Sequence, residues 1–249
     1  MGEPVLEVVR LRKRFGALQV TDDVSFAVRP ATIHAVIGPN GAGKTTLIQQ
    51  ICGTLRPDAG SVRLCGRDVT RLAPHRRARL GLARSFQITS VLPEFSAREN
   101  VALSVQGHRG ASFRLVGSAA GERALNAAAM AALERVGLAG RHGVPAALLS
   151  HGEKRQLELA MALAAQPAVM LLDEPLAGAG PEETQRLVAL LASLRASCAI
   201  VLVEHDMDAV FQLADVISVL ALGRVIAEGP PAAIRADAQV RRAYLGEDF

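Results

Sequence analysis

A glycine-rich segment is the first feature of this sequence that could carry chemistry. Residues 38–45 read GPNGAGKT and match the phosphate-binding pattern G-x-x-x-x-G-K-[ST]. An apolar run, Ile33–Ile37, precedes the segment, and a helical stretch, Lys44–Ile51, follows it. Glycines let backbone N–H groups turn toward an anion, and the start of the next helix carries partial positive charge. We therefore predict a nucleotide site with Lys44 on the β and γ phosphates and the Thr45 hydroxyl on magnesium.

Two adjacent carboxylates follow a second apolar run. Val169–Leu172 ends at Asp173 and Glu174. An acid at a strand tip is well placed to hold magnesium, directly or through water, so we assign this role to Asp173. Glu174 can accept a proton from the attacking water. A helix N-cap is the alternative interpretation of such acids, but the phosphate-binding segment favours the catalytic one.

A second helix start offers another place for an anion. Ser150 and Glu153 have the spacing of a capping box at the start of a predicted helix, Lys154–Ala165, with Gly152 beside them. One nucleotide needs only one phosphate-binding loop, so this second site is predicted to serve the nucleotide of another subunit. His205 follows a third apolar run and is expected at a strand tip on the side of Thr45 and Asp173.

The elements that must position these residues alternate between strands and helices. Three runs are almost continuously apolar and predict parallel strands covered on both faces: Ile33–Ile37, Val169–Leu172 and Ile200–Val203. In the earlier runs, apolar and polar residues alternate more, which predicts antiparallel strands with one solvent-exposed face. The remaining predicted strands are Val5–Leu11, Val24–Val28, Val62–Cys65, Ile217–Leu220 and Arg224–Ala227, and the helices between the apolar runs are Lys44–Ile51, Pro181–Ala196 and Met207–Leu213. This order predicts an α/β fold.

The middle of the chain has a different pattern. Residues 88–157 lack β-rich runs and are dominated by Ala and Leu, which predicts a helical insertion in the α/β domain. Ser96 and Glu99 have the spacing of a capping box, so a helix should begin there. Helical spacing also marks Glu122–Val136, and Val105–Gly121, rich in Gly and Ser, is expected to be a loop.

Composition excludes several classes of protein. Half of the 249 residues are apolar and 21% are charged, as in a globular chain. The three cysteines are far apart, which disfavours a disulfide framework or a zinc site and fits a reducing cytosol. The sequence contains no apolar run of about 18 residues, so it predicts no membrane-spanning helix. The N-terminal segment also lacks the apolar run of a signal peptide.

Charge gives little support to nucleic-acid binding. The net charge is +4, but basic residues are spread along the chain and only 3% of residues are aromatic. A solvated surface is the simpler interpretation. Lysine occurs only at Lys13, Lys44 and Lys154, while arginine is abundant. Because the chain otherwise favours arginine, a lysine at position 44 indicates that a compact point charge has a specific role there.

Taken together, these motifs resemble the ATP-binding subunits of ABC transporters over residues 5–246. The resemblance implies one ABC ATP-binding domain, 1–249, with an inserted helical subdomain, 88–157. Its fold would be a P-loop NTPase core with a mostly parallel sheet, an antiparallel β subdomain and the α-helical insertion. It also implies ATP and Mg²⁺ as ligands. Two such subunits would pair head to tail, with each ATP between one P-loop and the partner's signature helix.

The resemblance assigns roles residue by residue. It implies catalytic roles for Glu174, His205 and Gln87, the last in the Q-loop sequence RSFQ, and it places Thr45, Gln87 and Asp173 on magnesium. Phe15 matches the aromatic residue that stacks on adenine. The residues implied to bind ATP are Phe15, Gly38, Pro39, Asn40, Gly41, Ala42, Gly43, Lys44, Thr45, Thr46, Ser150 and Gly152.

Two departures from the general family point to one branch. His151 replaces the usual first glycine of the signature, and Gly180 stands where an Asp often precedes the proline. Both are similar to the ATPases of importers for branched-chain amino acids and their urea or amide relatives, as are residues 223–229 and 243–246. The implied function is to power import of such small polar metabolites. An ATPase for a lipid exporter and a soluble ABC ATPase are the alternatives.

The resemblance also implies partners and a location. It implies a second ATP-binding subunit, identical or paralogous, two integral-membrane permease subunits and, indirectly, an extracytoplasmic binding protein. Those other subunits would select the transported molecule. The chain would then be peripheral, at the cytoplasmic face of the inner (plasma) membrane.

We expect residues 87–93 to receive the membrane subunit, because Gln87 lies where the α/β core meets the helical insertion; a simple linker is the alternative.

Overall fold

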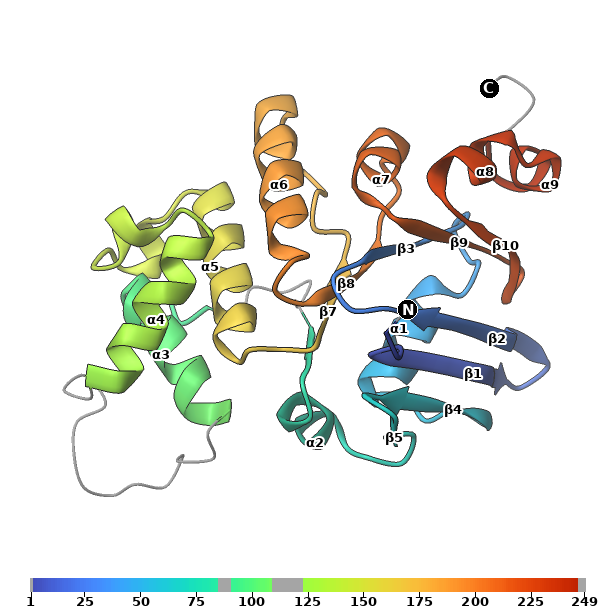
Figure 1. Ribbon diagram of the computed structural model, residues 1–249, viewed down its shortest axis with the longest axis horizontal. Helices are drawn as coiled ribbons and strands as arrows, with labels where there is room; N and C mark the ends of the chain where they lie inside the picture. Colours follow the sequence, from blue (N-terminus) through green and yellow to red (C-terminus); the bar gives the residue numbers. More distant parts are fainter. Residues whose placement is uncertain (1, 85–90, 109–122, 246–249) are drawn as a thin grey trace.

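The computed structural model describes residues 2–84, 91–108 and 123–245, and these form two sheets and a group of helices (Figure 1). The larger sheet has six strands in the order β10-β9-β3-β8-β7-β6. Its parallel members are β9 (Val216–Ala221), β3 (Ile33–Ile37), β8 (Ala199–Val203), β7 (Val169–Asp173) and β6 (Leu82–Arg84), and β10 (Arg224–Gly229) joins antiparallel at one edge. Every residue of β3, β7 and β8 is buried, as their apolar runs predicted.

The second sheet is antiparallel and covers the first helix. It has four strands in the order β2-β1-β4-β5, with β1 at Leu6–Phe15, β2 at Leu18–Val28, β4 at Ala59–Leu64 and β5 at Arg67–Asp68. Its inward side chains form one apolar cluster with α1 (Lys44–Cys52) and with β7 and β8. The alternation of buried and exposed residues in β1 and β2 is what the sequence predicted. This packing fixes α1 between the two sheets.

Three helices form a separate lobe beside the larger sheet (Figure 1). They are α3 (Ala97–His108), α4 (Arg123–Arg135) and α5 (His151–Ala164), and their apolar faces share one core. The expected loop Val105–Gly121 is wrong at its start, because α3 continues to His108 and buries Val105. Val101 and Val105 lie one turn apart on the buried face of α3. Their burial stabilises the helix and offsets the weakening effect of Gly107. Residues 109–122 lie outside the described chain, and the boundaries 88–157 stay a prediction.

Four further α-helices follow β7 and cover the larger sheet and the C-terminal region. They are α6 (Pro181–Leu194), α7 (Met207–Leu213), α8 (Pro231–Ala236) and α9 (Ala238–Val240), followed by a π-helical turn at Arg241–Leu245. The sequence pattern did not predict α2 (Pro74–Arg79), whose buried residue is Arg77 rather than an apolar one. Arg77 donates to the carbonyls of Gln50 and Ile51 at 2.8 and 2.6 Å and so caps the end of α1. In the part of the chain that is described, no helix is long and apolar enough to cross a membrane.

A polar network that links β3, β9 and β10 gives the first testable prediction. His34 is 1% exposed, and its Nε2 lies 2.7 Å from Ser218 Oγ, which donates to Glu228. Burial lowers the pKa of His34 to about 4. The unfolded chain therefore binds a proton on His34 more readily than the folded chain does. Neutral His34 contributes fully to stability above about pH 6.5, and this contribution falls as the pH drops toward 4. We expect a loss of about 3 kcal/mol at most, because one pKa unit corresponds to about 1.4 kcal/mol.

Urea unfolding between pH 4 and pH 7 tests this prediction. His34→Gln provides the control, because the variant retains a hydrogen-bonding side chain but cannot titrate in this range. The free energy of unfolding should depend less steeply on pH in the variant than in the wild type. Parallel pH profiles would show that His34 does not carry the effect.

Candidate nucleotide-hydrolysis site

The phosphate-binding loop leaves the end of β3 and enters α1. Gly43, the residue before α1, has φ 103°, a conformation that favours glycine. A Cβ atom there would collide with the carbonyl oxygen of Val20 on β2. The backbone of the β9–β10 turn also holds the loop, since the Gly223 N–H donates to the carbonyl of Ala42 at 3.1 Å. Both sheets therefore fix the shape of the loop.

Lys44 lies within the loop and close to the two acids. Its ammonium donates to the carbonyls of Gly38 and Pro39 at 2.5 and 3.1 Å. Burial lowers the pKa of Lys44, and the charges of Glu174 and Asp173 oppose that shift. The lysine is thus a partly desolvated cation whose present partners are neutral carbonyls, which a phosphate can replace.

Asp173 ends β7 and is 7% exposed. Its Oδ2 lies 3.5 Å from Arg84 Nη2 on the neighbouring strand β6. Burial raises the pKa of Asp173, while the charge of Arg84 works in the opposite direction. The arginine therefore compensates part of the cost of burying the carboxylate.

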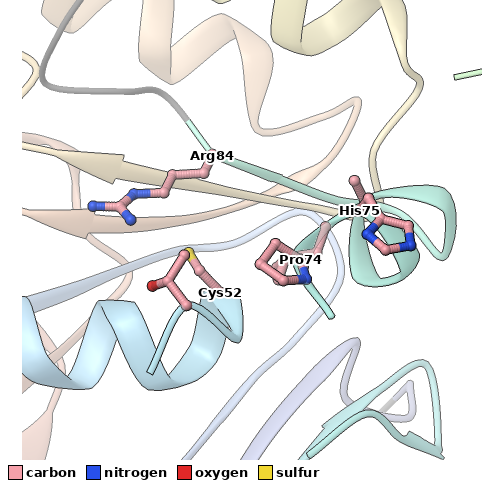
Figure 2. Close-up of a pocket in the computed structure, with 7 residues that line it drawn as sticks. Cys52, Pro74, His75 and Arg84 are labelled. Carbon is pink, nitrogen blue, oxygen red and sulfur yellow. The ribbon is translucent and has the colours of Figure 1, made fainter. Parts of the chain in front are cut away.

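Arg84 also borders a cavity of about 210 Å³ between α1, α2 and β6. Cys52, Pro74 and His75 line the same cavity. Figure 2 shows the Arg84 side chain extending away from Pro74 and His75. Arg84 was not predicted from the sequence, because its position beside Asp173 depends on the pairing of β6 with β7.

Glu174 turns away from the strand with a left-handed backbone, φ 51°. Its N–H donates to the carbonyl of Val203 on β8 at 2.8 Å, so the neighbouring strand holds this conformation. A non-glycine residue in this region costs energy and marks a position that the surroundings fix. His205 follows β8, and its Nδ1 lies 3.9 Å from Glu174 Oε1. The structure thus places the ends of β7 and β8 together, as the sequence predicted.

Ser150 and Glu153 form the predicted capping box at the start of α5. The N–H of Glu153 donates to Ser150 Oγ at 3.3 Å, and the Ser150 N–H donates to Glu153 Oε2 at 2.8 Å. The hydrogen bond from the Ser150 N–H to the carboxylate lowers the pKa of Glu153. Figure 1 shows α5 beside α3 and α4 and separated from α1. Ser150 and Gly152 are therefore not brought to the phosphate-binding loop of the same chain.

The other predicted ATP-binding residues occupy the loop and an exposed strand end. Phe15, at the end of β1, is 48% exposed, and the ammonium of Lys13 lies 5.6 Å from its ring centroid. The side chain of Thr45 is exposed in the first turn of α1. The rest of the set runs from β3 into α1 and comprises Gly38, Pro39, Asn40, Gly41, Ala42, Gly43 and Thr46. Gln87 lies outside the described residues.

Magnesium fits the residues of this site. Among the described residues, no group of three or more His, Cys, Asp and Glu side chains could hold a metal ion. Magnesium at a nucleotide needs no such cage, because it keeps waters and binds phosphate oxygens with one or two protein ligands. The hydroxyl of Thr45 and the carboxylate of Asp173 are ligands of that kind.

This fold and this loop define the class of a P-loop NTPase cassette. The parallel core, the antiparallel sheet and the helical lobe match the sequence prediction of the fold. A family model described as "ABC transporter" matches residues 21–177, and one described as "Branched-chain amino acid ATP-binding cassette transporter" matches residues 224–249.

Full-length relatives agree with these matches. The chain is 37% identical to the branched-chain amino acid transport ATP-binding protein BraF of Pseudomonas aeruginosa and 38% identical to LivG of Escherichia coli K12, over 99% of this chain and 100% of each relative. A crystal structure of the ADP conformation of an ABC transporter cassette superposes with a TM-score of 0.85 and 27% identity, over 99% of this chain and 100% of that one. The chain belongs to the ABC transporter family, in which ATP-binding proteins couple ATP hydrolysis to transport.

Proposed function

We propose that this chain hydrolyses ATP to power an ABC importer for branched-chain amino acids or related small polar metabolites. One observation carries the proposal. Lys44 at the start of α1 lies near Asp173, Glu174 and His205 at the ends of β7 and β8, in a chain whose C-terminal segment matches the branched-chain amino acid family model. The lipid-exporter alternative has the same compact cassette, and the match of residues 224–249 favours the importer.

The proposed roles follow from the positions of the side chains. Lys44 contacts the β and γ phosphates, with the backbone N–H groups of the loop around them. Glu174, which is partly exposed beside His205, accepts a proton from the attacking water, and His205 orients Glu174. Magnesium, when bound by Thr45, Asp173 and Gln87, neutralises charge on the phosphates. Phe15, at the exposed end of β1, stacks on adenine.

The second phosphate-binding helix end supports a paired arrangement. Ser150 and Gly152 stand at the start of α5, in the helical lobe that Figure 1 shows apart from α1. We propose that they contact the ATP held by the loop of a second ATP-binding subunit, identical or paralogous. Two sites would then lie between the two subunits, and each would be incomplete in a single chain.

The proposed assembly contains two integral-membrane permease subunits, with a binding protein acting indirectly from outside. The chain would be peripheral, on the cytoplasmic face of the inner membrane. Affinity purification of the tagged chain from detergent-solubilised membranes tests this assembly. We expect two permease proteins in stoichiometric amounts. Recovery of the chain with ribosomes or DNA, and without membrane proteins, would contradict the proposal.

The surface that receives the membrane subunit gives a second prediction. The expected segment, 87–93, follows β6, whose residues Leu82 and Arg84 line the cavity described above. Val91 is half-buried against the core of the helical lobe, while Leu92 is 44% exposed. We expect Val91→Glu to leave basal ATPase activity largely intact, because it touches no phosphate ligand. It should abolish stimulation by the membrane subunits and block uptake.

A matched pair of variants separates docking from folding. Leu92→Glu places the same charge on the exposed neighbour and should reduce stimulation without lowering the thermal unfolding temperature. Leu103→Glu, on an exposed part of α3, serves as the control outside the segment. ATPase stimulation and uptake in proteoliposomes are the measurements. Normal uptake by the Val91 and Leu92 variants would place the docking surface elsewhere.

A further inference from the structure

The carboxylate of Glu204 is fully buried between the two loops that carry Glu174 and His205. Glu204 follows β8 and is 1% exposed. Its Oε1 accepts the N–H of Leu176 at 2.7 Å, and its Oε2 accepts the N–H of His205 at 3.1 Å. The Nδ1 of His205 lies 3.8 Å from Oε2 as well. Each oxygen of the carboxylate therefore holds a different loop.

These two loops meet at the position where the reacting groups lie. Leu176 is two residues after Glu174, whose left-handed backbone must be held by its surroundings. Val203 fixes Glu174 from one side through its carbonyl, and Glu204 fixes the chain after it. The same Glu204 side chain fixes the backbone of His205, whose ring faces Glu174 at 3.9 Å. One side chain thus contacts both the loop after Glu174 and the backbone of His205.

The chemistry of the contact requires a carboxylate. Two backbone N–H donors point at the side chain, and an ionised carboxyl group has two acceptor oxygens. A glutamine has the same shape but only one acceptor, so its NH₂ group would face one of the N–H donors. Burying a carboxylate is costly unless hydrogen bonds satisfy it, which argues that these two bonds are specifically retained.

We propose that Glu204 is a positioning residue for ATP hydrolysis, tying the loop after Glu174 to His205 so that the two catalytic groups keep their spacing. This inference rests on the proposed function. It adds a residue that the phosphate, magnesium and adenine contacts do not include. It also gives a connection between the two loops within one subunit, through Leu176 and His205.

Glu204→Gln tests the inference. We expect kcat for ATP hydrolysis to fall about tenfold or more, because a hydrogen bond to a charged group is lost. The KM for ATP and the affinity for ADP with magnesium should stay within about twofold, because Glu204 is not among the proposed nucleotide ligands. Glu228→Gln is the matched control, since Glu228 accepts a hydrogen bond from Ser218 in the polar network that links β3, β9 and β10. Its kcat should equal that of the wild type.

A double-mutant cycle distinguishes positioning from general stabilisation. If Glu204 acts through His205, Glu204→Gln should cost little in single-turnover hydrolysis once His205→Ala is present. Glu204→Asp keeps the charge with a shorter reach and supplies the same comparison if the glutamine variant does not fold. Unchanged kcat, an increase confined to KM, or additive losses would overturn the inference. Absence of ATP hydrolysis by the wild type would instead overturn the proposed function.

Discussion

Glu174→Gln should bind ATP normally, hydrolyse almost none of it and hold two ATP-binding subunits together. The amide keeps the size of the carboxylate and one acceptor oxygen but cannot accept a proton from the attacking water. ATP then remains between the phosphate-binding loop of one subunit and Ser150 of the other, and hydrolysis no longer separates them. Size-exclusion chromatography with ATP and magnesium should show a long-lived dimer, and the loss in kcat should be at least about a hundredfold.

Glu182→Gln is the control for this experiment. Glu182 is an exposed acid on α6 that pairs only weakly with Arg186, at 3.6 Å, so its loss should change neither hydrolysis nor association. ATP retention by the assembled membrane complex provides a second readout, because that complex already contains two ATP-binding subunits. A Glu174→Gln chain that stays monomeric with its ATP site saturated, and a complex that retains no ATP, would together refute the proposed pairing.

Lys44→Ala should nearly abolish hydrolysis and weaken ATP binding. Lys44 is the proposed point charge on the β and γ phosphates, and the alanine variant leaves those charges without it in a partly buried site. We expect kcat to fall at least about a hundredfold and the dissociation constant for ATP to rise about tenfold. ATPase assays and equilibrium binding of a fluorescent ATP analogue measure the two effects.

Lys154→Ala is the matched control, because Lys154 is another of the three lysines but lies on α5. It should hydrolyse ATP at close to the wild-type rate when assayed at saturating ATP. Wild-type turnover by purified Lys44→Ala would mean that the loop at 38–45 does not hold the hydrolysed phosphate.

The parallel core was predictable because burial on both faces leaves a simple pattern. Ile33–Ile37 and Met207–Leu213 have the bounds that the sequence predicted, and β7 and β8 differ by one residue at one end. The sequence also located the ends of β7 and β8 and both capping boxes, since strand tips and helix starts depend on local residue types. Asp173, Glu174 and His205 could therefore be placed before the structure was known.

The elements and contacts that the sequence did not reveal depend on long-range partners. Strand β6 has only three residues and forms by pairing with β7, and β5 has only two. The buried guanidinium of Arg77 donates to the carbonyls of Gln50 and Ile51, which are distant in the sequence. The arginine-rich sequence around it therefore resembles that of a solvent-exposed segment. Arg84 and Glu204 also could not be predicted, because their roles depend on which strands and loops the fold brings next to them.

Leucine transport by the complex that copurifies with this chain tests the central claim most directly. The complex would be reconstituted in vesicles with its binding protein, and the movement of radiolabelled leucine would be followed with and without ATP. We predict ATP-dependent movement in the import direction by the wild-type complex and none by a complex of equal composition that carries Lys44→Ala. Leucine movement that is independent of ATP, or equal movement by the Lys44→Ala complex, would contradict the account.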